Sequence, residues 1–219
     1  MVDKLYKFLK AHTHKGLRRA VGKLYIELSL SRKHFFARKR LKNFTDVNLK
    51  FNMGCGRYLK EGWFNIDIGQ KNCINLDLRE RLPFSDGIAS QIYSEHFFEH
   101  QVFPVDALTF LHESFRMLCN GGLFSIGVPD GQILLESYCN GTAINDFEIK
   151  ATLPENPTSM QLVNVLFRNF GHQYIYDYET LAKILREVGF INVTRRPFDP
   201  SMDSEHRRDW TLYIDAYKP

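Results

Sequence analysis

The chain has 219 residues, of which 44% are hydrophobic and 25% charged, and its formal net charge is +4. This composition is typical of a globular protein with one α/β domain and a short appendage, and it excludes wholesale disorder. No apolar run reaches about 18 residues and no secretory leader is visible, so we expect neither a transmembrane helix nor export. The four cysteines stand far apart without a C-x-x-C pair. They therefore predict neither a zinc site nor a disulfide framework. Cysteines of this kind are typical of the reducing cytoplasm, so we expect a cytoplasmic location.

Charge divides the chain near residue 44. Residues 1–44 carry 13 Lys/Arg and 2 acidic residues, whereas residues 45–219 carry 16 Lys/Arg and 23 acidic residues. Leu17, Val21, Leu24 and other apolar residues recur at helical spacing among the basic ones, which predicts a basic helical arm broken around residues 13–16.

Two interpretations of this arm are open. It is either a helical lid packed on the acidic domain, or a device for peripheral contact with an anionic surface such as lipid headgroups or nucleic acid. We favour the lid, because aromatic side chains do not alternate with the basic ones as in base-stacking surfaces. Nucleic acid is therefore not an expected partner, peripheral contact with a membrane stays open, and the sequence does not predict an oligomeric state.

Residues 45–219 read as alternating strands and helices. Helices are expected where apolar residues recur every three or four positions, from Val105 to Leu118 and from Leu181 to Val188. Seven strands are expected, at residues 47–53, 63–67, 73–77, 88–93, 123–128, 191–194 and 211–216. This alternation predicts a Rossmann-like, doubly wound, mostly parallel seven-stranded sheet. A polar segment at about residues 131–171 interrupts the pattern, and we expect this insertion to cover the acceptor side of the site.

Open sheets of this kind bind ligands at the carboxyl ends of their strands. Several residues able to carry chemistry stand at these predicted ends: Gly54, Gly56, Asp67, Asp77, Ser94, Glu95, His96 and Asp130. The two glycines allow a tight turn and a close approach of the backbone to a ligand.

The glycine turn does not match a nicotinamide dinucleotide site. Leu59 stands where the third glycine of G-x-G-x-x-G belongs, and Asp67 follows Gly56 by only 11 residues rather than about 20. The helix between them must be short, which disfavours a bound pyrophosphate. A nucleoside ligand without pyrophosphate fits better: Asp67 can accept hydrogen bonds from ribose hydroxyls, and Asp77 one from an adenine amino group.

Taken together, the motifs resemble those of class I S-adenosylmethionine (SAM)-dependent methyltransferases. The pattern is that of small predicted members, with N-x-G-C-G, G-W-x-N-x-D, Y-S-E-H-x-x-E-H and V-P-D in this order. Here these motifs occupy residues 52–56, 62–67, 93–100 and 128–130, and the resemblance extends over roughly residues 48–217. It implies the class I methyltransferase fold with SAM as the cofactor.

The resemblance also implies roles for individual residues. The methionine part of SAM would lie around Gly54, Cys55 and Gly56, with Asn52 near its amine in place of the family's usual acid. Asp67 would bind the ribose, and Asp77 and Leu78 the adenine. Ser94 and Glu95 would line the cofactor beside the sulfonium.

Methyl transfer to oxygen also requires a base that removes the acceptor's proton. The candidates are His96, Asp130 and His172, each next to a predicted strand end or in a loop near the pocket. His96 and His100 are four residues apart and could share a helical face with Glu99, a spacing that also admits a metal site. We predict no metal, because the sequence assigns no third ligand and E-H-x-x-E-H is not a known metal signature.

The sequence thus predicts a SAM-dependent methyltransferase that acts, at oxygen, on a small molecule or on a sugar of a surface glycan. The glycan acceptor, and with it a place in polysaccharide biosynthesis, follows from the resemblance alone. The alternative is a non-catalytic SAM-binding or regulatory protein, which the lack of a clear base motif keeps open.

Overall fold

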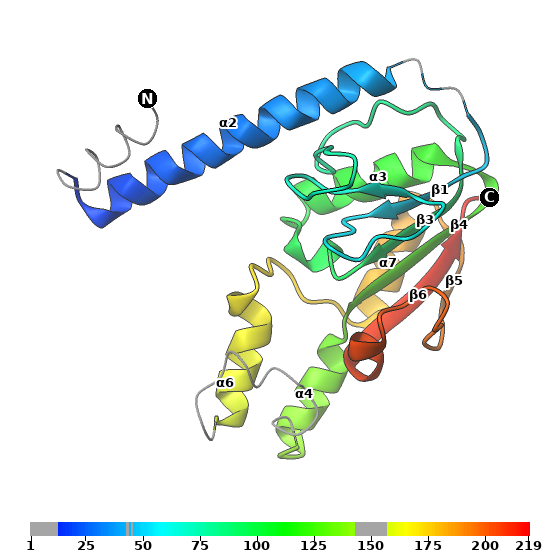
Figure 1. Ribbon diagram of the computed structural model, residues 1–219. Helices are drawn as coiled ribbons and strands as arrows, with labels where there is room; N and C mark the ends of the chain where they lie inside the picture. Colours follow the sequence, from blue (N-terminus) through cyan, green and yellow to red (C-terminus); the bar gives the residue numbers. More distant parts are fainter. Residues whose placement is uncertain (1–12, 43, 45, 143–156) are drawn as a thin grey trace.

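A computed structural model describes residues 13–42, 44, 46–142 and 157–219 (Figure 1). Within them, one sheet of six strands has the order β2-β1-β3-β4-β6-β5. The strands are β1 (Leu49–Met53), β2 (Phe64–Ile66), β3 (Ala89–Glu95), β4 (Leu118–Pro129), β5 (Ile191–Arg195) and β6 (Thr211–Tyr217). The first four pair in parallel, whereas β6 runs antiparallel to both β4 and β5. The carboxyl ends of β1 to β4 therefore meet at one edge.

The prediction of a seventh strand at residues 73–77 is wrong. This segment makes a single parallel bridge, between Ile74 and Ile66. Its polar groups bind locally instead: the Asn75 side chain accepts a hydrogen bond from the Gly69 amide, and the Asp77 amide donates to His34 Nδ1. With these groups bonded locally, the segment does not extend the ladder beyond the bridge at Ile74.

Two amphipathic helices, α3 (Val105–Met117) and α7 (Tyr178–Val188), pack against each other and against the sheet. The Asp177 side chain caps the first turn of α7 through the Thr180 amide, and the helix ends at Gly189 with φ 116°. Their apolar faces, with Leu111 and Leu185 fully buried, join the strand side chains in one hydrophobic core.

The basic arm is described from residue 13 onward and forms the helix α2 (Lys15–Leu41), capped by the His14 side chain. Only its C-terminal third contributes buried residues, namely His34, Ala37 and Leu41. The rest of α2 extends away from the sheet (Figure 1), and its apolar Leu24 and Leu28 are about 60% exposed. Among the described residues, no helix has the length and apolar character needed to cross a membrane.

The insertion after β4 forms a small helical unit. It consists of α4 (Gly131–Cys139), α6 (Ser159–Asn164) and the π-helical turn η3 (Val165–Asn169), while residues 143–156 lie outside the described part. Its own apolar cluster contains Leu134, Leu162, Val165 and Leu166. In Figure 1 this unit lies beyond the end of β4, to one side of the sheet.

Candidate functional site

A cavity of about 320 Å³ opens where β1, β2 and β3 end. The predicted site residues that line it are Asn52, Gly54, Cys55, Gly56, Asp67, Glu95 and His96. The parallel pairing of β1 with its two neighbours brings these residues together from three separate stretches of sequence.

The two glycines of the turn after β1 serve different purposes. Both adopt positive φ, 69° at Gly54 and 52° at Gly56. A Cβ on Gly54 would lie 2.1 Å from Cγ of Phe97, so the absence of a side chain there makes room for an aromatic ring that lines the cavity. A Cβ on Gly56 would meet no atom within 4 Å. Gly56 is therefore the glycine at which a ligand can approach the backbone closely.

Asp67 connects the end of β2 to this turn. Its Oδ2 accepts a hydrogen bond of 2.8 Å from the Gly56 amide, and burial raises the pKa of its carboxyl group. A carboxylate has about four acceptor positions. Asp67 therefore keeps acceptor capacity for a ligand in the cavity while it fixes the glycine turn.

Asn52 holds the same turn from the other side. Its amide nitrogen donates to the Tyr58 carbonyl at 2.9 Å and to Asn65 Oδ1 at 2.8 Å. The Asn65 amide in turn donates to the Lys60 carbonyl. These bonds shape the loop after β1 without a helix, as the short distance between Gly56 and Asp67 predicts.

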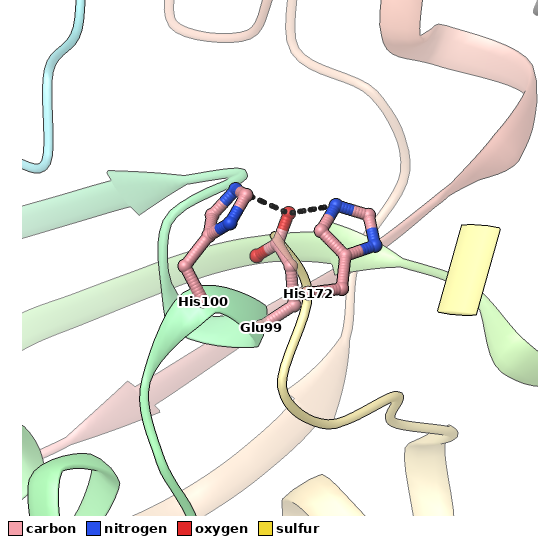
Figure 2. Close-up of side chains that lie close together, drawn as sticks. All are labelled: Glu99, His100 and His172. Carbon is pink, nitrogen blue, oxygen red and sulfur yellow. Dashed lines mark ion pairs between the residues drawn. The ribbon is translucent and has the colours of Figure 1, made fainter. Parts of the chain in front are cut away.

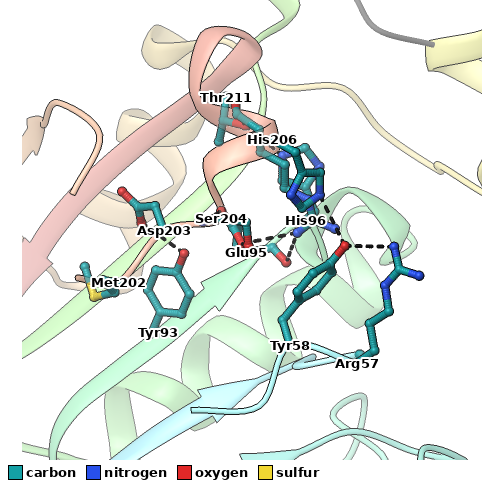
Figure 3. A network of polar contacts seen from close by, with 12 residues as sticks. Arg57, Tyr58, Tyr93, Glu95, His96, Met202, Asp203, Ser204, His206 and Thr211 are labelled. Atoms are coloured by element: carbon teal, nitrogen blue, oxygen red, sulfur yellow. Dashed lines mark hydrogen bonds and ion pairs between the residues drawn. The ribbon is translucent and has the colours of Figure 1, made fainter. Parts of the chain in front are cut away.

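Glu95, at the end of β3, joins the cavity wall to the C-terminal segment (Figure 3). Its carboxylate accepts hydrogen bonds from the amide and the hydroxyl of Ser204, at 3.0 and 2.6 Å, and from the Tyr213 hydroxyl at 3.3 Å. Arg207, on the short helix η4 (Glu205–Trp210), forms an ion pair with this carboxylate, its Nη1 lying 3.3 Å from Glu95 Oε2. Glu95 therefore acts mainly to hold η4 over the cavity.

The sequence did not assign any basic residue to the cofactor cavity. Arg57, Lys60 and Arg207 all line it. Lys60 lies 4.4 Å from the ring centroid of Tyr93, and burial lowers the pKa of its amine. The position of Arg57 and Lys60 directly after G-C-G is a local signal that could have found them. Arg207 has no such signal, because a long-range fold-back brings it there.

His96 is the predicted base that lines the cavity. Its backbone is left-handed, with φ 53°, a conformation that costs energy for a residue with a side chain. Its Nε2 lies 2.8 Å from Thr211 Oγ1 (Figure 3), and burial lowers its pKa well below the usual value.

The other predicted residues do not line the cavity. Asp77 forms a bidentate pair with Arg79, at 2.9 and 2.7 Å, and the side chains of Leu78 and Ser94 are buried in the fold. Asp130 caps α4 and lies 3.4 Å from Arg195, while His172 is buried against the Leu166 carbonyl. Contacts of the last four to a cofactor or acceptor stay predictions, as does the adenine contact of Asp77.

Comparison with known proteins bears on the fold. No protein family profile and no curated protein sequence matches the chain. The crystal structure of a SAM-dependent methyltransferase from Archaeoglobus fulgidus is similar to it, with a TM-score of 0.52 and 19% identity, covering 88% of this chain and 94% of that chain. The fold is that of this methyltransferase.

Two further structures are similar to a lesser degree. One is a possible histamine N-methyltransferase from Thermotoga maritima, with a TM-score of 0.45 and 14% identity, covering 92% of this chain and 97% of that chain. The other is phosphoethanolamine N-methyltransferase 2 from Haemonchus contortus in complex with S-adenosyl-L-methionine, with a TM-score of 0.49 and 11% identity, covering 86% of this chain and 52% of that chain. At such identities the likeness concerns the fold alone, so the function must be argued from the site.

Proposed function

We propose that the protein is a SAM-dependent methyltransferase that binds its cofactor in the cavity at the ends of β1, β2 and β3. The observation that carries this proposal is the link between Asp67 and Gly56. It places an acid with spare acceptor capacity beside the glycine whose neighbourhood is open. A ribose that donates to Asp67 would thereby place the rest of the cofactor along the glycine turn.

The remaining lining supports the same ligand. SAM has a carboxylate at its methionine end, and Lys60 and Arg57 are cationic residues in the cavity wall that could pair with it. The volume of about 320 Å³ is at the lower end of the roughly 300–1,000 Å³ typical of small-molecule sites. SAM supplies a methyl group that is already activated, so the protein's main task is to hold the acceptor in line with it.

For the acceptor, we propose a hydroxyl of a small molecule or of a surface-glycan sugar. This part of the proposal follows the sequence resemblance. His96 is the candidate to receive the acceptor's proton, because it lines the cavity whereas Asp130 and His172 do not.

Calorimetric titration with SAM, S-adenosylhomocysteine and NAD tests the cofactor proposal. We expect the two sulfur ligands to bind and NAD not to bind. Asp67→Ala should weaken SAM binding by at least about 1 kcal/mol, as expected for the loss of a hydrogen bond to a charged group. Asp67→Asn, which can still accept from the Gly56 amide, separates loss of the ribose contact from loss of the turn.

Asp46→Ala is the matched control, because Asp46 is an exposed acid away from the cavity. Equal SAM affinity in wild type and in both Asp67 variants would contradict the ribose assignment. Transfer of a labelled methyl group from SAM to a component of cell extract then separates an enzyme from a non-catalytic SAM-binding protein.

A further inference from the structure

A buried carboxylate behind the cavity faces histidines instead of hydrogen-bond donors. Glu99 lies on the short helix η1 (Phe98–His100), and its side chain is 1% exposed. Among the described residues, neither of its oxygens accepts a hydrogen bond from another residue. His100 Nε2 and His172 Nε2 each lie 3.9 Å from Glu99 Oε1 (Figure 2), and His96 Nδ1 lies 3.5 Å from the same oxygen.

Hydrogen bonds at the far side of two of these rings determine where their protons are. His172 Nδ1 bonds to the Leu166 carbonyl, which can only accept, so this nitrogen carries the hydrogen. The Thr211 hydroxyl donates to the Arg207 carbonyl and must therefore accept from His96 Nε2. In the neutral form of both rings, the nitrogen that faces Glu99 then carries a lone pair and no hydrogen.

The third ring also faces Glu99. His100 interacts with the backbone of Gly171, and its Nε2 lies 3.9 Å from Glu99 Oε1. Lone pairs from the His96 and His172 rings thus point at a carboxylate oxygen in a buried space. Such an arrangement is repulsive unless a positive centre lies between the groups.

We propose that Glu99, His100 and His172 form a binding site for one divalent transition-metal ion, with zinc as the expected ion. The three donor atoms lie within 4.8 Å of one another. In tetrahedral zinc sites with bonds of about 2.0–2.1 Å, neighbouring ligand atoms are about 3.3 Å apart. Each histidine nitrogen, 3.9 Å from Glu99 Oε1, therefore needs to move about 0.6 Å closer to it, and donor atoms as far apart as 4.8 Å need to approach each other by about 1.5 Å.

The surroundings match those of known metal sites. Histidine ligands usually donate their second ring nitrogen to a carbonyl or a carboxylate, which fixes the tautomer. The Leu166 carbonyl does this for His172, and the backbone of Gly171 interacts with His100. Imidazole and carboxylate donors suit zinc or a similar transition metal rather than magnesium.

The site borders the candidate cofactor cavity, because His100 lines both. Three protein ligands would leave one position of a tetrahedral ion available, as in catalytic zinc sites. The inference does not depend on methyl transfer: the cluster would bind the metal whether or not the cavity binds SAM.

A shared proton is the competing explanation of the cluster. Burial raises the pKa of Glu99 to about 8, so a protonated carboxyl group could donate to one of the rings. The metal site predicts that added zinc binds to the cluster, whereas the shared proton predicts that it does not. Cys55 and Cys73, whose thiols interact beside Asp67, are the alternative donors that added metal could use.

The test uses the full-length protein after treatment with a chelator, titrated with ZnCl₂ by calorimetry. Wild type should bind one zinc per chain, with MgCl₂ giving no comparable binding. Glu99→Gln and His172→Gln should each weaken zinc binding at least tenfold. The control is His112→Gln, which removes an exposed histidine of α3 and should bind like wild type. His100→Gln replaces either variant if that variant does not fold.

Cobalt(II) identifies the donor atoms. The cobalt protein should show d–d absorption without a sulfur-to-cobalt charge-transfer band. Lack of zinc binding would overturn the proposal in favour of the shared proton. Unchanged affinity in Glu99→Gln would also overturn it, and a charge-transfer band would place the metal at Cys55 and Cys73. Zinc binding without SAM binding would refute the proposed function and leave this site standing.

Discussion

The candidate cofactor cavity and the Glu99 cluster adjoin at the end of β3, and they treat carboxylates in opposite ways. In the cavity, Asp67 is bonded to the Gly56 amide, and Glu95 to Ser204 and Arg207. In the cluster, Glu99 is almost completely buried, and three imidazole nitrogens lie within 3.9 Å of one of its oxygens. The carboxylates of the cavity thus have hydrogen-bond partners and still leave room for a ligand. The Glu99 carboxylate of the cluster, in contrast, needs a cation or a proton as its partner.

The largest expected effect concerns the packing under the cavity. Gly54→Ala should destabilise the protein by about 3 kcal/mol or more, because its Cβ would overlap the Phe97 ring and its φ is 69°. Gly56→Ala is the matched control: it has the same left-handed strain but open space, so about 1–2 kcal/mol is expected. Urea unfolding measures both, and equal losses would show that Phe97 does not occupy the space over Gly54.

A second prediction concerns the Glu95 carboxylate in the cavity wall and its bonds to Arg207 and Ser204. Glu95→Ala should cost about 3 kcal/mol of stability, because it leaves Arg207 unpaired and removes acceptors from Ser204. It should also weaken SAM binding, since η4 would no longer be held over the cavity. Urea unfolding and calorimetry measure the two effects. A variant as stable as wild type would contradict the role of Glu95 in holding η4.

A third prediction uses stability to compare the two regions. Zinc at about 100 times its dissociation constant should stabilise the wild type by about 2.7 kcal/mol. It should not stabilise Glu99→Gln, whereas SAM should stabilise both proteins, because the cavity does not require the Glu99 carboxylate. Thermal melting with each ligand provides the measurement. Loss of both effects in Glu99→Gln would mean that the cavity and the cluster are not separable.

The smallest expected effect is a pH dependence in the cavity. Because burial raises the pKa of Asp67, its carboxylate becomes protonated at a higher pH than an exposed aspartate. SAM affinity should therefore fall on acidification before the usual aspartate range is reached, by up to about tenfold per pH unit. Asp67→Asn should not show this fall. An identical pH profile in this variant would assign the dependence to another group.

The sequence predicted the parts of the site that depend on local rules. Parallel strands align their carboxyl ends, so Gly56, Asp67 and Glu95 could be placed at one edge from their positions after predicted strands. The prediction failed for residues 73–77, where the Asp77 amide bonds to His34 of α2 instead of extending the sheet. That contact comes from a helix more than 40 residues away, and strand propensity contains no information about it.

The Glu99 cluster shows the same limit. His96, Glu99 and His100 are close in sequence, and the spacing of the two histidines admitted a metal site without supplying a third ligand. The chain brings His172 to the cluster because the amides of Gln173 and Tyr174 both donate to the Glu99 carbonyl. Such long-range backbone bonds leave no pattern in the sequence.

Calorimetric titration of the full-length protein with SAM tests the central claim most directly. The account predicts one SAM per chain, no binding of NAD, and weaker SAM binding in Asp67→Asn than in Asp46→Ala. Failure of SAM to bind to a folded wild-type protein, or equal affinity in these two variants, would contradict it.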